Sequence, residues 1–457
     1  MKHVLLVPLL LCAAPALAQP APVDPKVAAL RNAALRDDYA WDITEGLSTE
    51  VGQRLAGTEA EARARDWAVR KLRSLGFANV RVEPFDMPTW TRGPESADIL
   101  APFPQRLVVA ALGNSASTPP EGITGQVVGF DTLAELQAAP DSAVRGKIVF
   151  VSHAMPRTQD GSSYGHFGGA RRQGPSVASR KGAIAIVIRS IGTDYHRNPH
   201  TGVMRFADGV RPIPAGALSI PDAEQLQRIL KRGRAVAMRL VLVSEAGRGR
   251  SGNVIAEVPG LDPKAPPILV ACHLDSWDQG TGAVDDAAGC GIVAAAAKRI
   301  MDAGRPLRTI RVVWFGAEEP GLFGGEAYKA KYGALSHWAM AESDFGAGRV
   351  WQVNSRLGKE REAEATALQA ALAPLGIVPG ALDQADGSDI GPMIAAGAPA
   401  VELGQDGTYY FDLHHTPDDT LDKVDPEALR QNVAAWTAML AVLSGGIEPG
   451  PKRPKRR

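Results

Sequence analysis

From Gly252 onward, short apolar segments alternate with segments of helical periodicity, and this alternation restricts the fold more than any other feature of the sequence. The strand-like segments are NVIAEVPG, PILVACH, TIRVVWFGA, WAMAESD and PAVELG, and the helical ones span residues 286–303, 321–331, 359–375 and 426–444. Strands that are apolar along their whole length are buried on both faces, as in parallel sheets. We therefore predict an α/β fold in which a mixed, mainly parallel sheet is sandwiched by helices.

The sequence before Gly252 divides into a helical region and a β-rich region. Residues 25–75 have helical periodicity that stops at Gly76, and a strand, NVRVEPFDM, follows. Between residues 103 and 245, short strands are separated by loops rich in Gly, Pro and Asn, which indicates a separate β-rich domain. We therefore predict one domain made of residues 19–102 and 246–446, interrupted by an insert of residues 103–245.

The first 18 residues have the three parts of an export signal. Lys2 supplies the positive head, residues 4–14 the apolar run, and residues 16–18, Ala-Leu-Ala, the small-residue cleavage site. We expect residues 1–18 to be removed and the mature chain to be periplasmic or secreted. Residues 447–457, which end in PGPKRPKRR, are predicted to form a basic disordered tail.

Charge and cysteine content exclude several classes of protein. Lys plus Arg and Asp plus Glu number 50 each, so the net charge does not favour nucleic acid or an anionic membrane as a partner. Beyond the signal, no segment reaches about 18 unbroken apolar residues, so no membrane span is predicted. Cys12 leaves with the signal, whereas Cys272 and Cys290 are expected to be buried small hydrophobic residues that form no disulfide.

Imidazoles and carboxylates follow the ends of the predicted strands. PILVAC leads to His273, TIRVVWFGA to Glu318 and Glu319, WAMAES to Asp344, and PAVELGQD to the HHT sequence at 414–416. After His273 the chain turns through two glycines before it reaches Asp285. Ligands of open α/β sheets bind at the carboxyl ends of the strands, so we expect these side chains to meet at one edge of the sheet.

Five of these residues form a set that suits two metal ions: His273, Asp285, Glu319, Asp344 and His415. Each metal would have one imidazole and one carboxylate of its own, and the remaining carboxylate would be shared. Histidine and carboxylate ligands favour zinc, although cobalt or manganese could occupy the same shell. Asp275 is placed to orient the imidazole of His273, and one residue of the pair Glu318 and Glu319 can act as a general base.

Each of these residues also has an ordinary interpretation. His273 could be a solvated histidine at a strand end, and the pair Glu318 and Glu319 an acidic turn before Pro320. Asp344 could cap a helix, and the two neighbouring histidines could be one core and one surface residue. Their joint placement at four strand ends favours the metal site.

The motifs HLDSWDQGTGAVDDAAG, WFGAEEPGLFGG, AESDFG and LHHTPDDT together resemble the M28 family of co-catalytic zinc peptidases, and most closely its carboxypeptidase Q branch. The similarity extends to GQRLAGT at residues 52–58, to residues 198–224 and to residues 386–400. It covers nearly the whole mature chain. Each motif alone is weak, and the combination is highly specific.

The resemblance implies a zinc-exopeptidase fold and a role for each residue of the site. His273 and Asp344 would bind one zinc, Glu319 and His415 the other, and Asp285 would bridge the two Zn²⁺ ions. In the family, the metal ligand is the histidine directly before Thr or Ser, so the resemblance selects His415 over His414. By the same resemblance, Glu318 would be the general base and Asp275 the hydrogen-bond partner of His273. The substrate pocket would include His200, Ser388, Asp389 and Tyr410.

The resemblance also implies that the insert is a protease-associated domain and that the enzyme is an exopeptidase acting on short peptides with a free N-terminus. For the predicted pocket residues, an ordinary structural role in turn capping, in packing or in a loop remains an alternative. Two other functions are compatible with the fold: a single-zinc glutaminyl cyclase and a non-catalytic, receptor-like protein. The oligomeric state is open, with a homodimer as one option.

Overall fold

The computed structural model describes residues 23–448, and a mixed sheet forms its centre. Strands β11 (Ile310–Phe315), β9 (Ile268–His273), β12 (Ala339–Glu342) and β15 (Ala400–Gln405) pair in parallel in that order. Antiparallel strands flank them, with β8 (Ala237–Val258) beside β11 and β13 (Val350–Arg356) beside β15. The short β14 (Val378–Pro379) completes this edge. The predicted mixed, mainly parallel sheet is therefore confirmed.

Helices cover both faces of this sheet, because successive side chains of its central strands point to opposite faces and nearly all of them are buried. Val312 and Trp314 of β11 pack into one hydrophobic core with helices α10 and α15, whereas Val313 and Phe315 pack into a second core with α11 and α13. The first layer contains α1 (Pro25–Ala34), α2 (Tyr39–Gly46), α10 (Ala288–Ala303), α12 (Glu362–Leu372) and α15 (Pro426–Leu443). The second contains α11 (Phe323–Tyr332) and α13 (Gly391–Ala395).

The helical region at residues 25–75 is interrupted by a loop that reaches the centre of the molecule. After α2 and a π-helical turn at residues 47–51, Gly52 adopts a φ of 76° and the chain leaves the helix. Helix α3 (Glu59–Ser74) begins at Thr58, whose Oγ1 accepts a hydrogen bond from the amide of Glu61. The intervening loop carries Arg54, which is fully buried.

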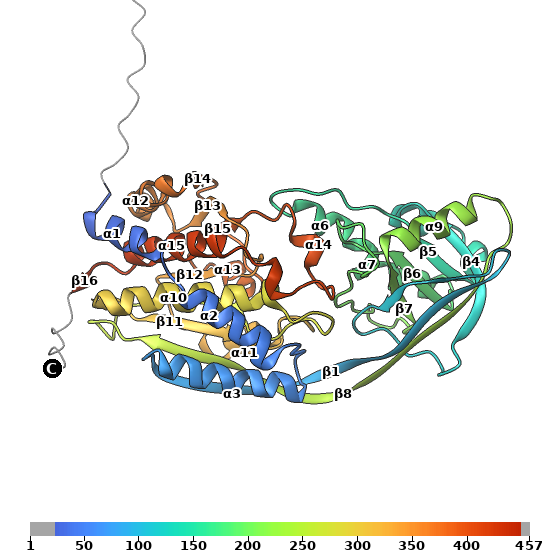
Figure 1. Ribbon diagram of the computed structural model, residues 1–457, viewed down its shortest axis with the longest axis horizontal. Coiled ribbons are helices and arrows are strands. Elements are labelled where there is room, and N and C mark those ends of the chain that lie inside the picture. The colour runs from blue at the N-terminus through green and yellow to red at the C-terminus, as the bar shows by residue number, and fades with distance from the viewer. Residues whose placement is uncertain (1–22, 449–457) are drawn as a thin grey trace, which may run out of the picture.

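Two long antiparallel strands, β1 (Ala78–Ala101) and β8, lead from the central sheet to the insert, which lies at the other end of the molecule (Figure 1). Strand β8 runs through the predicted boundary at residue 246, so the two parts share a continuous ribbon. In the insert, β4 (Ile123–Phe130), β5 (Ile148–Val151), β6 (Ala185–Arg189) and β7 (Ala215–Leu218) pair in parallel.

Helices connect β4 to β5 and β5 to β6, because parallel strands need crossover connections, whereas a segment without a helix connects β6 to β7. The insert helices are α4 (Leu133–Ala138), α5 (Asp141–Val144), α6 (Ser162–Phe167), α7 (Gly169–Arg172), α8 (Gly174–Arg180) and α9 (Ile220–Leu230). Strand β3 (Val109–Ala111) pairs antiparallel with β7, and β2 (Gln105–Leu107) pairs with β1. Residues 103–245 thus contain both short strands and helices.

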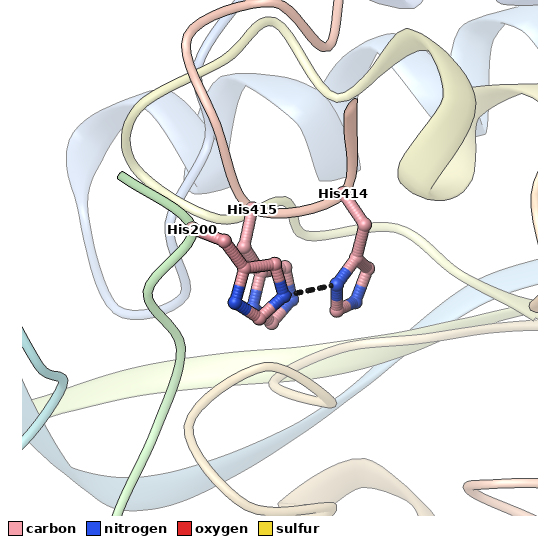
Figure 2. A group of neighbouring side chains, drawn as sticks. All are labelled: His200, His414 and His415. Atoms are coloured by element: carbon pink, nitrogen blue, oxygen red, sulfur yellow. Dashed lines mark hydrogen bonds between the residues drawn. The ribbon is translucent and has the colours of Figure 1, made fainter. Parts of the chain in front are cut away.

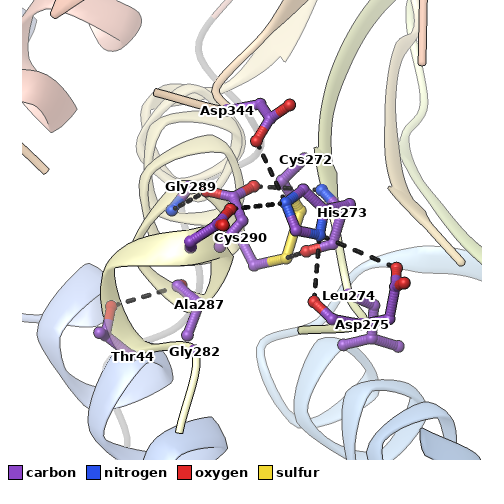
Figure 3. The surroundings of a disulfide bond; sticks show 12 residues. Thr44, Cys272, His273, Leu274, Asp275, Gly282, Ala287, Gly289, Cys290 and Asp344 are labelled. Carbon is purple, nitrogen blue, oxygen red and sulfur yellow. Dashed lines mark hydrogen bonds and ion pairs between the residues drawn. A yellow bond between two sulfur atoms is a disulfide. The ribbon is translucent and has the colours of Figure 1, made fainter. Parts of the chain in front are cut away.

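Cys272 and Cys290 form a disulfide, so the expectation of two free cysteines is wrong (Figure 3). Both residues are fully buried, as expected. Cys272 lies in β9 and Cys290 in the first turn of α10, and the packing of this helix on the strand brings their Cα atoms to 5.2 Å. A spacing of 18 residues between a strand and a helix gives no sign in the sequence of this contact.

The predicted signal at residues 1–18 and most of the predicted tail lie outside the described residues. The first two tail residues form β16 (Ile447–Glu448), which pairs with β10 (Arg305–Pro306). Within residues 23–448, no helix is both long enough and apolar enough to span a membrane.

Candidate metal centre

Strand β9 ends at His273, whose imidazole lies between two carboxylates. Its Nε2 is 3.0 Å from Oδ1 of Asp285 and 3.1 Å from Oδ1 of Asp344 (Figure 3). Its Nδ1 is 3.0 Å from the main-chain oxygen of Asp275, while the Asp275 carboxylate lies 3.8 Å away. A hydrogen bond at Nδ1 fixes the ring and directs Nε2 toward the carboxylates.

The second oxygen of Asp285 points toward the other histidine. Oδ2 of Asp285 is 3.3 Å from Nε2 of His415, and the same nitrogen is 2.7 Å from Oε2 of Glu319. Asp285 therefore lies between two groups, each made of one imidazole and one further carboxylate. All five predicted ligands meet at the carboxyl edge of the parallel strands.

The unsatisfied atoms and the charges of this cluster fit metal ions. Among the described residues, Oδ2 of Asp285 and both carboxylate oxygens of Glu319 are buried without a hydrogen bond, and such groups are uncommon unless an ion or water satisfies them. Burial lowers the pKa of His273, but Asp344, Asp275 and Asp285 outweigh it and raise this pKa well above its usual range. The carboxylates thus attract positive charge, which zinc can provide.

The two glutamates after β11 have different surroundings. The amides of Glu318 and Glu319 donate to the two carboxylate oxygens of Asp275, at 3.1 and 3.3 Å. Glu319 is buried against His415, whereas Glu318 is only partly buried and lines a cleft. Burial, together with the nearby charge of Asp344, raises the pKa of Glu318 well above its usual range. A raised pKa suits a residue that takes up and returns a proton.

A stack of aromatic rings supports His415. His414 lies 3.6 Å from its ring and Trp277 5.1 Å, both nearly parallel to it. His200, from the insert, is stacked at 5.5 Å, and its Nε2 is 2.8 Å from Nδ1 of His414 (Figure 2). His200 is fully buried and does not line the cleft, and its ring contacts Tyr164 as well as the two histidines.

A cleft of about 960 Å³ opens beside the cluster, between the domain of the central sheet and the insert. Of the predicted pocket residues, Ser388 and Tyr410 line this cleft, and the Ser388 hydroxyl donates to Oδ2 of Asp344. Asp389 is fully buried beneath it, where Oδ1 accepts a hydrogen bond from the amide of Gly325 at 2.9 Å. Glu342, which the sequence analysis did not single out, also lines the cleft, and burial raises its pKa to about 8.

Comparison with known proteins identifies the family of the chain. The model of peptidase family M28 matches residues 253–440. Carboxypeptidase Q of Homo sapiens is 34% identical over 406 residues, which cover 88% of this chain and 84% of that protein. The chain belongs to peptidase family M28. Membership confirms the predicted enzyme class, a metallo-exopeptidase.

Solved structures of M28 peptidases share the fold. The crystal structure of a peptidase M28 precursor from Shewanella amazonensis is 47% identical and superposes with a TM-score of 0.89, covering 94% of this chain and 99% of that one. An aminopeptidase from Aneurinibacillus is 21% identical, with a TM-score of 0.63 and coverage of 93% and 97%. At that identity, the second likeness shows the fold alone.

Two buried residues that the sequence analysis did not assign hold the loop of this M28 peptidase between His273 and Asp285. Arg54 donates to three main-chain oxygens of that loop, those of Leu274, Thr281 and Gly282, at 2.6, 2.7 and 2.9 Å. Asp419 accepts hydrogen bonds from the amides of Val284 and Asp285, at 2.7 and 3.2 Å. GQRLAGT contains Arg54, but the sequence does not show that its partners are carbonyl groups 220 or more residues away.

Arg54→Lys should reduce both stability and metal content. Lysine keeps the charge but cannot reach three carbonyls with a planar fork, so buried oxygens lose their donors. We expect a loss of about 2 to 4 kcal/mol in the free energy of unfolding, from denaturant titration, together with fewer bound metal ions. The exposed Arg36→Lys is the matched control. A change below about 0.5 kcal/mol at Arg54 would contradict the role of this residue.

Proposed function

We propose that this M28 peptidase is a dizinc exopeptidase that removes residues from the free N-terminus of short peptides. The observation that carries the proposal is the position of Asp285, with one oxygen toward His273 and the other toward His415. Such a carboxylate can bridge two ions, and a single ion would be over-ligated by three carboxylates and two imidazoles.

The ligand assignment follows from these contacts. His273 and Asp344 would hold one zinc, His415 and Glu319 the other, and Asp285 would belong to both. When bound, the zinc ions supply Lewis acidity to polarise the scissile carbonyl and to activate water. Support for zinc comes from the fold shared with a zinc aminopeptidase from Bacillus subtilis, with a TM-score of 0.64 at 21% identity.

The residues around the ions supply proton transfer and orientation. Glu318 faces the cleft, so it can accept a proton from the attacking water and return it to the leaving amine. Asp275 keeps Glu318 and Glu319 in place through their amides. The acidic wall beside Asp344, which includes Glu342, can orient the N-terminal amine of the substrate.

We also infer that the insert at residues 103–245 is a protease-associated domain that limits the cleft to short peptides. It contributes one wall of the cleft, including Asp160, Tyr164 and Arg205. Residues 1–18 support export of the protein, and the disulfide between Cys272 and Cys290 agrees with an oxidising compartment.

Protein purified without chelator should contain close to two zinc equivalents per chain by elemental analysis, because the donor set divides into two groups. Glu319→Ala should lower the value toward one, while Glu326→Ala, on the exposed side of α11, should leave it unchanged. One equivalent in the unmodified protein would exclude the two-zinc centre and would favour the single-zinc cyclase.

Glu318→Gln should keep both metal ions and lose most turnover. The amide can still form hydrogen bonds but cannot accept the proton of water, so kcat should fall by about 10²- to 10⁴-fold. The measurement is steady-state kinetics combined with zinc analysis, and Glu326→Gln serves as the surface control. Retention of near-native kcat with full metal content would exclude Glu318 as the general base.

Acetylation of the substrate amine should abolish most cleavage. The neutral amine has a lone pair and a small volume, both of which acetylation removes, so a site built for that polar group loses an anchor. We expect at least about a 10³-fold decrease in kcat/KM for an N-acetyl dipeptide relative to the free dipeptide. Preferential cleavage of the acetylated form would overturn the aminopeptidase assignment.

A further inference from the structure

We propose that Arg171 and Arg205, both from the insert, form a subsite for the free carboxylate at the far end of a dipeptide, on the assumption that the function proposed above is correct. This subsite makes the enzyme favour peptides whose carboxyl terminus lies one residue beyond the cleaved bond. The insert thus acts in substrate selection as well as in limiting the size of the cleft.

The starting observation is a group of unpaired cations. Arg171, Arg172 and Arg205 all line the cleft. Within residues 23–448, none of these three forms an ion pair. By contrast, the half-buried Arg189 of the insert does have an acidic partner, Glu224 at 3.0 Å.

Arg171 is the most confined of the three, because its side chain is only 5% exposed. One terminal nitrogen donates to the main-chain oxygen of Thr201, while Nε has no hydrogen-bond partner among the described residues. A Cβ added at Gly202 would lie 2.2 Å from Nη1 of Arg171 and 2.5 Å from Nδ1 of His415. The guanidinium is therefore next to one end of the metal centre.

Arg205 approaches the centre from the side of the glutamates. Its side chain is exposed and extends to Gly321, where an added Cβ would lie 3.5 Å from Nη2 of Arg205. Gly321 belongs to the turn that follows Glu318 and Glu319, and it also lines the cleft. Arg171 and Arg205 thus approach the reacting region from two sides.

The ring of Tyr164 supports two of the positive charges. The guanidinium groups of Arg171 and Arg172 lie 5.2 and 5.7 Å from its centroid, and the ring itself stacks on Phe411 at 4.5 Å. Arg172 is further anchored to the main-chain oxygen of Gly165 at 2.6 Å. These cation–π contacts offset part of the repulsion between the two guanidinium groups but do not neutralise their positive charge.

The acidic residues of the cleft cannot serve as permanent ion-pair partners of these three arginines. The metal ligands would be neutralised by the zinc ions, which leave the centre with an excess positive charge. Asp160, on the insert side, accepts hydrogen bonds from the hydroxyl and amide of Ser162 at 2.7 and 3.1 Å. The other acidic residues of the cleft lie outside the insert: Glu318, Glu342, Asp386 and Glu402.

The cleft therefore has an acidic wall and a basic wall, with the metal centre between them. A dipeptide has an amine at one end and a carboxylate at the other, and its extended length is roughly 7 Å. An unpaired cation in a largely buried position is unfavourable, and a carboxylate that binds the planar guanidinium compensates it. The free acid of a dipeptide supplies this group, whereas its amide does not.

The experiment compares alanyl-alanine with alanyl-alanine amide in the zinc-loaded full chain, measuring kcat and KM for both. For the unmodified enzyme we expect kcat/KM to favour the free acid by about 10- to 100-fold, the range of one or two charge-assisted hydrogen bonds. Arg205→Gln should reduce this preference at least about fivefold, chiefly through KM of the free acid. Arg205→Lys should restore part of it.

Arg171→Gln should have the same effect, because glutamine can still donate to Thr201 but has no charge. Its zinc content is measured in parallel, since Arg171 lies near His415. The matched control is Arg232→Gln, an exposed arginine of the insert outside the cleft, which should leave the preference unchanged.

An acid-to-amide ratio that stays the same in both Arg205→Gln and Arg171→Gln would overturn the subsite, as would a ratio near one in the unmodified enzyme. Either result would leave N-terminal exopeptidase action intact, provided that the amide is cleaved. Failure to cleave either substrate, or preference for an N-acetyl peptide, would instead contradict the proposed function itself.

Discussion

The structure depends on the need to neutralise carboxylates that are packed together and largely shielded from solvent. Asp285, Glu319 and Asp344 all approach two imidazoles within a small volume, and the first two are almost fully buried. Their mutual repulsion is acceptable only if cations lie among them. The loop between β9 and α10 is accordingly fixed by buried groups of its own, the guanidinium of Arg54 and the carboxylate of Asp419, which would have no comparable purpose in an ordinary loop.

Much of this arrangement could be predicted from the sequence because parallel strands bring their carboxyl ends to one edge of the sheet. The apolar runs before His273 and Glu318 predicted both the strands and the edge at which the ligands meet. Contacts that depend on three-dimensional proximity alone were not predictable. The disulfide between Cys272 and Cys290 joins a strand to a helix, and Arg54 reaches carbonyls more than 200 residues away. Strand β13 was also missed, because its mixture of polar and apolar residues suits an edge of the sheet, where one side is less buried.

The insert is in direct contact with the proposed metal centre. Thr201 accepts a hydrogen bond from the indole of Trp277 at 2.6 Å and donates to the side chain of Gln279 at 2.7 Å. Both partners lie in the loop that also presents Asp285, and the neighbouring His200 supports His414. Local pattern alone could not establish these contacts, because residues 198–202 resemble an ordinary loop until their partners are known. The geometry of the proposed metal site and the position of the insert are therefore coupled through a few buried hydrogen bonds.

The ribbon formed by β1 and β8 has a consequence for how such an enzyme can change over time. The insert lies between these two strands in the sequence, and they pair with each other along most of their length. Replacing the chain beyond the end of the ribbon would keep the strand order of the central sheet and the five proposed metal-binding positions, which lie outside the insert. It would replace the basic wall of the cleft. Substitutions in the insert that keep the contacts of His200 and Thr201 can therefore alter which peptides are accepted, because the proposed metal ligands and the basic wall are encoded in separate stretches of the gene.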